Sequence, residues 1–157
     1  MSETAAVRPM ANLLSAARDG HFSVTMRPEE FVYIDRDCEY FKNAIRAIQS
    51  IMDRVSKQTT WGLGEGNSEL VSAGTVVERF KKKANGAGDG NSVWKIMEEH
   101  YRIVEDIQAT YRTVRERIME ADSAFAGEFN RLNETLPDRT PEASTYGPFI
   151  LPDGSTR

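Results

Sequence analysis

Very few side chains in this sequence are of a type and spacing that could perform chemistry. There are two histidines, His21 and His100, and one cysteine, Cys38. A catalytic nucleophile needs an adjacent base and a group that orients this base, and no Ser/His/Asp or Cys/His grouping supplies them. His100 and Cys38 instead fall on apolar helix faces, where a packed or partly exposed structural histidine and an inert buried thiol are the simpler interpretation. We expect no catalytic residue and a protein that is not an enzyme.

Three other patterns could indicate ligands, and each has a structural interpretation. Glu98 and His100 are two residues apart and point to different helix faces, whereas di-iron bundles use Glu-x-x-His. The G-x-G in Gly86–Gly90 lacks the preceding strand of a dinucleotide site. The basic run Lys81–Lys83 fits a helix C-terminus. We therefore expect no metal, no cofactor and no nucleic acid.

The first long element must be a helix over residues 28–57. Pro28 suits a first helical turn, and the acidic residues that follow it complement the helix dipole. Its apolar residues alternate in steps of four and three, the spacing of a helix packed lengthwise on another. Ala44 and Ile51 widen this stripe, which indicates burial against more than one neighbour. The main seam positions are Ile34, Cys38, Phe41, Ile45, Ile48, Met52 and Val55.

A short helix over residues 68–83 follows, and then a glycine-rich connector over 85–91. The longest element is expected over residues 92–133, about 60 Å if continuous. Its seam also alternates in steps of three and four. The main positions of this second seam are Val104, Ile107, Tyr111, Val114, Ile118 and Phe125.

The two matching seams predict an all-α protein. We expect an elongated antiparallel helical hairpin with a short extra helix, which completes a four-helix-type bundle on dimerisation. The expected domains are a flexible N-terminal arm at 1–27, the hairpin domain at 28–135 and a proline-rich disordered tail at 136–157. Tail residues Tyr146, Phe149, Ile150 and Leu151 leave a second interpretation open, a short recognition segment.

The turn between the first two helices contains Trp61, Gly62 and Gly64. The glycines cannot easily continue a helix. An indole at this place can plug the end of a hairpin, contact a partner, or do both.

The composition and charge of the chain limit the number of domains and the classes of partner. A chain of 157 residues, 39% of them hydrophobic, suits one domain with a modest core. Its net charge of -4 offers no overall attraction to nucleic acid or to an anionic membrane. A single cysteine cannot form an intramolecular disulfide. We also expect no ordinary signal peptide and no membrane insertion, because no segment approaches about 18 uninterrupted apolar residues.

The order helix, Trp-Gly turn, helix resembles the Trp-x-Gly (WXG-like) helical-hairpin proteins of type VII (ESX) secretion systems. The resemblance covers roughly residues 29–132 and includes Trp61-Gly62-Leu63-Gly64 and the segment from Ala121 to Ala126. It implies a four-helix dimer with a partner, export as a folded pair, and a role as secretion substrate or as the helical partner or chaperone of one. It also implies a secretion motif of the form Tyr-x-x-x-Asp/Glu, which Tyr101 and Glu105 match, as do Tyr33 and Asp37.

The functional expectation is therefore a non-enzymatic protein that binds another small helical protein as a heterodimer, or itself as a homodimer. The resemblance implies secretion without a signal peptide through a type VII-like route. The alternative is a cytoplasmic helical adaptor or self-assembling bundle protein that is not exported.

Overall fold

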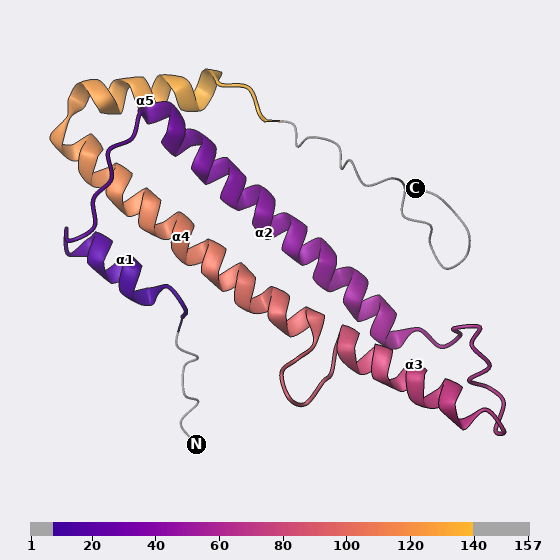
Figure 1. Cartoon of the computed structure of the whole chain (residues 1–157). Helices are drawn as coiled ribbons and strands as arrows, with labels where there is room; N and C mark the ends of the chain where they lie inside the picture. Colours follow the sequence, from indigo (N-terminus) through magenta and orange to yellow (C-terminus); the bar gives the residue numbers. More distant parts are fainter. Residues whose placement is uncertain (1–7, 140–157) are drawn as a thin grey trace.

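The computed structural model describes residues 8–139, which form helices and loops without any strand. The helices are α1 (Ala11–Arg18), α2 (Pro28–Lys57), α3 (Val71–Ala84), α4 (Val93–Ala121) and α5 (Ser123–Thr135). The prediction of an all-α fold is confirmed. Helices α2 and α4 lie side by side and run in opposite directions (Figure 1). Helix α1 packs against α4, α5 crosses one end of the pair, and α3 lies at the other.

Helix α2 begins where its sequence predicts. Pro28 occupies the first turn, where a backbone N–H would lack an intrahelical acceptor in any case. The N–H of Arg27 donates to the Glu30 carboxylate at 2.7 Å, which satisfies one of the groups left free at a helix start. The helix then runs for 30 residues, about 45 Å at 1.5 Å per residue.

The prediction of one continuous helix from Ser92 to Asn133 is wrong. The chain becomes extended at Asp122, and the Asp122 carboxylate accepts the N–H groups of Ala124 at 2.9 Å and Phe125 at 3.0 Å. An aspartate in this position caps a new helix. The break turns α5 across the ends of α2 and α4 (Figure 1).

The predicted loose arm at 1–27 also differs from the structure, because it contains helix α1. Ala17 of α1 is fully buried, so this helix is held by packing on α4. Gly20 ends it with φ +78°, a conformation that favours glycine. The Arg117 guanidinium fills the adjacent space and donates to the Ala17 carbonyl at 3.0 Å.

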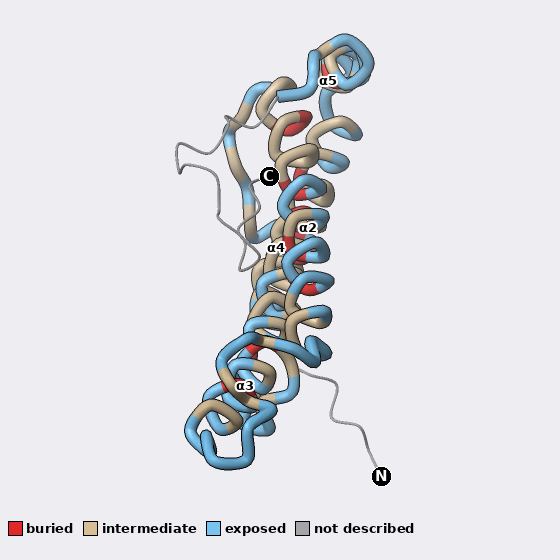
Figure 2. Tube along the Cα trace, turned by 90° about the vertical axis from the view of Figure 1, so that its right-hand side faces the viewer, coloured by how far each residue is buried: buried red, intermediate tan, exposed pale blue. Residues whose placement is uncertain are grey.

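The main core lies at the α5 end. Phe31 and Val32 of α2 meet Val114 of α4, Phe129 of α5 and Ala17, and all five are buried. Figure 2 shows burial along the line where α2 and α4 meet, whereas the surroundings of α3 are mostly exposed. The molecule therefore has one well-packed end and one thinly packed end.

No helix within residues 8–139 is long and apolar enough to cross a membrane. Of the predicted disordered tail at 136–157, only residues 136–139 belong to the described part, and residues 140–157 lie outside it. The same holds for residues 1–7 of the predicted arm.

Candidate partner-binding surface

The side of α2 that faces α4 is half polar. Asp35, Lys42 and Gln49 recur at intervals of seven on this side, where they alternate with the buried residues Cys38 and Ile45. Every second position on the side of α2 that faces α4 is polar. Helix α4 therefore covers only part of the apolar stripe of α2. The rest of the stripe faces elsewhere.

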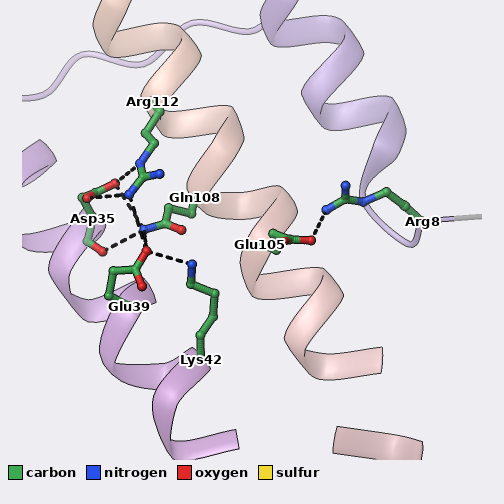
Figure 3. Close-up of polar contacts among 7 residues, drawn as sticks. All are labelled: Arg8, Asp35, Glu39, Lys42, Glu105, Gln108 and Arg112. Carbon is green, nitrogen blue, oxygen red and sulfur yellow. Dashed lines mark hydrogen bonds and ion pairs between the residues drawn. The ribbon is translucent and has the colours of Figure 1, made fainter. Parts of the chain in front are cut away.

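The polar contacts between α2 and α4 form two groups, of which Figure 3 shows the first. Arg112 of α4 pairs with both carboxylate oxygens of Asp35, with Nη2 3.0 Å from Oδ2. Gln108, 3% exposed, donates to Glu39 at 2.9 Å. Hydrogen bonds from the Lys42 ammonium and the Gln108 amide hold the pKa of Glu39 below its ordinary value. These contacts fix the register of α4 against α2.

The second group lies one to two turns further along α2. The Gln49 amide donates to Glu98 at 3.0 Å and to the Trp94 carbonyl at 3.1 Å, and Gln49 is 3% exposed. Arg46 donates to the Glu98 carboxylate at 2.6 Å. The Gln49 amide first, and then the Arg46 guanidinium, lower the pKa of Glu98. The carboxylate is thus held ionised between two donors.

The predicted seam residues of α2 fall into a buried group and an exposed group. Ile45 is buried and Met52 is half-buried, whereas Phe41 is 58% exposed and Ile48 is 38% exposed. Tyr40 and Ile51 are exposed as well, at 53% and 43%. We call Tyr40, Phe41, Ile48 and Ile51 the outer row. The row follows the helix for about three turns.

The second seam lies mostly inside the molecule. Val114 is buried and belongs to the main core. Tyr111 and Phe125 both pack edge-on against Phe31, with ring centroids 6.3 and 5.9 Å away. Ile118 also packs on this core. Val104 and Ile107, nearer the middle of α4, are half-buried.

The predicted turn is held in place by an aromatic stack and by hydrogen bonds within the chain. The Trp61 indole stacks on Phe80 of α3, with ring centroids 5.9 Å apart, and donates to the Gln58 carbonyl at 3.1 Å. The Glu65 carboxylate accepts the backbone N–H groups of Trp61, Gly62 and Leu63, which lowers the pKa of Glu65. Gly62 and Gly64 have φ values of +70° and +85°. Trp61 therefore packs against α3 at this end of the molecule and stays partly exposed.

The two residues of the predicted secretion motif are both engaged within the fold. The Arg46 guanidinium lies 3.8 Å from the centroid of the Tyr101 ring. Glu105 accepts a hydrogen bond from Arg8 at 2.6 Å, and the same Arg8 nitrogen lies 2.6 Å from buried Asp106 (Figure 3 shows the Glu105 contact). The motif lies mid-helix and contributes to packing.

The remaining residues of chemical interest have structural surroundings. His100 is exposed, and its Nδ1 lies 2.8 Å from the Ile96 carbonyl. Burial first, and the neighbouring Asp35 second, raise the pKa of the Cys38 thiol, which makes it a poor nucleophile. Within residues 8–139 no group of three or more His, Cys, Asp or Glu side chains could hold a metal ion.

The polar contacts between α2 and α4 were not predicted from the sequence, although one signal was present. Asp35, Lys42 and Gln49 form a polar heptad of their own, parallel to the apolar seam. Such a row reads as solvent-exposed unless complementary groups on a second helix are also considered.

Comparison with known proteins identified no relative: no family model matches the chain, and no significant match to a curated protein or a solved structure was found.

Proposed function

We propose that the protein is a non-enzymatic interaction protein that pairs lengthwise with a second small helical protein through the outer row. The observation that supports this is the exposure of Tyr40, Phe41, Ile48 and Ile51 on one side of a single helix. Isolated exposed apolar residues are ordinary, but a contiguous row of large ones indicates an interaction site. In the pairing we propose, α2 and α4 act as an antiparallel hairpin, and a second hairpin on the row completes a four-helix bundle.

The polar contacts between α2 and α4 support this geometry. A helix in a four-helix bundle has two neighbours and needs two apolar rows. The inward residues of α2 meet α4 through Ile45 and the Gln49 amide, while Tyr40, Phe41, Ile48 and Ile51 of the outer row stay exposed. A partner helix on this row would bury aromatic and isoleucine side chains, which contribute strongly to interfaces.

We further propose that this pairing serves a type VII-like secretion route, with the protein as substrate or as the helical partner or chaperone of one. The support is the Trp61-Gly62 turn between amphipathic helices. The cytoplasmic adaptor remains a second candidate, and a specific observation favours it. Tyr101 and Glu105 are engaged with Arg46 and Arg8, so a receptor would have to displace these contacts to read the motif.

The test is recovery of a tagged full chain from its native host, followed by size-exclusion chromatography with light scattering. The informative variant is F41S/I48S/I51S. Its matched control, V71S/V76S, makes the same kind of change at exposed residues of α3, which are 74% and 39% exposed. We expect the wild type and the control to retain a helical partner in a one-to-one complex, and the outer-row variant to lose it while keeping its helical circular dichroism.

Retention of the partner by F41S/I48S/I51S, or a wild-type chain that is monomeric in every extract, would contradict the outer-row proposal. A stable homodimer lost in the same variant would make the partner a second copy. Export is tested separately by fractionating cultures with an active secretion system, where protein confined to the cells would favour the cytoplasmic adaptor.

A further inference from the structure

A groove with a volume of about 700 Å³ lies where the chain passes from α5 along the first half of α2. Its apolar surface comes from Tyr33, Tyr40 and Phe41, and its other wall from Asp138 and Arg139. Tyr40 and Phe41 are in edge-on contact, with ring centroids 6.2 Å apart, and both belong to the outer row. The groove is thus continuous with the proposed partner-binding surface.

The last described residues, 136–139, contact the α2 side of this groove. The Arg36 guanidinium donates to the carbonyls of Asn133 and Leu136, both at 2.9 Å, and pairs with Asp138 at 3.2 Å. The Arg139 guanidinium lies 3.6 Å from the centroid of the Tyr33 ring. These contacts direct the following residues, from position 140 onward, to start at the groove.

The sequence that follows matches the groove in chemistry and reach. Residues 140–157 are mostly polar, but Tyr146, Phe149, Ile150 and Leu151 place four large apolar side chains within six positions. Phe149 comes ten positions after Arg139, a distance along the chain that spans up to about 33 Å when extended. Tyr33 and Phe41 are eight residues apart on a helix, about 12 Å. The segment reaches the whole groove without strain.

We propose that residues 146–151 bind in this groove of the same chain, against Tyr40 and Phe41, and cover the first part of the outer row. Attachment at Arg139 gives the segment an effective concentration near the millimolar range, so a weak apolar contact suffices. The inference rests on the proposed function only for its consequence, which is that the tail competes with the partner. Groove occupation itself needs no partner.

The experiment is ¹⁵N NMR of the full chain at a concentration where it is monomeric. The test variant F149S/I150S/L151S is compared with a control, E142S/D153S/T156S, that changes the same tail outside the apolar segment. In the wild type we expect backbone order parameters for residues 149–151 near the 0.85 of rigid backbone. We expect the amide signals of residues 33–43 to shift in the test variant and to stay in place in the control.

Order parameters below about 0.6 throughout residues 140–157, or unmoved signals at residues 33–43 in the test variant, would overturn the proposal. Shifts that disappear on tenfold dilution would also overturn it, because they would place the tail in the groove of a second copy.

The consequence for the partner is measured separately. If the tail occupies the groove in about nine of ten molecules, F149S/I150S/L151S should bind a partner about tenfold more tightly. NMR evidence of docking, with no partner recovered by the wild type or by F149S/I150S/L151S, would support this inference and contradict the proposed function. If the chain binds a partner but its tail is not docked, the proposed function is supported and this inference is contradicted.

Discussion

The α5 end of the molecule and the middle of the α2–α4 pair are stabilised by different kinds of contact. At the α5 end, four helices bury Phe31, Val32 and Phe129 in one apolar cluster. In the middle, the same two long helices meet through Gln49, Gln108 and their charged neighbours. Buried polar pairs specify how helices align but add little net stability, whereas apolar burial adds more. The apolar cluster at the α5 end therefore stabilises the folded monomer, while the polar contacts in the middle fix the alignment of α2 and α4 and leave apolar surface uncovered.

The largest expected effect is at the α5 end. Phe31 is 2% exposed and contacts the rings of Tyr111 and Phe125. Phe31→Ala should lower the free energy of unfolding by about 3–5 kcal/mol, because it removes buried apolar surface and leaves a cavity. Urea unfolding followed by circular dichroism measures this loss. A loss below about 1 kcal/mol would mean that stability does not reside at this end.

Two isoleucines of α2 differ in burial and should differ in their contribution to monomer stability. Ile45 is 7% exposed and Ile48 is 38% exposed, three residues apart on the same helix. Ile45→Ala should cost about 2–4 kcal/mol of monomer stability, as for other buried aliphatic truncations. Ile48→Ala should cost about 1 kcal/mol and should weaken partner binding instead. Equal losses of monomer stability in the two variants would mean that the outer row is already covered in the monomer.

The smallest effect tests the polar contacts. The lowered pKa of Glu98 means that its contribution to stability is present above the ordinary glutamate pKa, about 4.3, and is lost as the pH falls through the lowered pKa of the folded state. Glu98→Gln keeps the shape but removes the charge. We expect it to cost about 0.5–1 kcal/mol at pH 7 in urea unfolding. This difference from the wild type should shrink toward pH 3, and one that is constant with pH would exclude the charge as its source.

Much of the fold follows from the sequence, because the signals lie within single helices. The start of α2 at Pro28, its end at Lys57 and the start of α4 next to Ser92 depend on local capping and periodicity. The turn at Trp61 is also a local feature, since the neighbouring glycines exclude a helix there.

The features that the sequence did not reveal depend on contacts between helices. Asp122 reads as one more exposed acid in a periodic helix, and its role as a cap appears only once α5 has a surface to cross. The short helix around Ala17 is stable only because α4 buries it. Ile45 and Ile48 belong to adjacent rows of one wide stripe, and the position of α4 decides which row stays uncovered.

The turn at Asp122 also bears on how large an assembly can become. Two helices ending flush at both ends would form a rod whose ends could add further rods in line, and such head-to-tail contacts grow into open filaments. Helix α5 instead lies across the ends of α2 and α4 and closes that face (Figure 1). Linear stacking through that end of the molecule is therefore blocked.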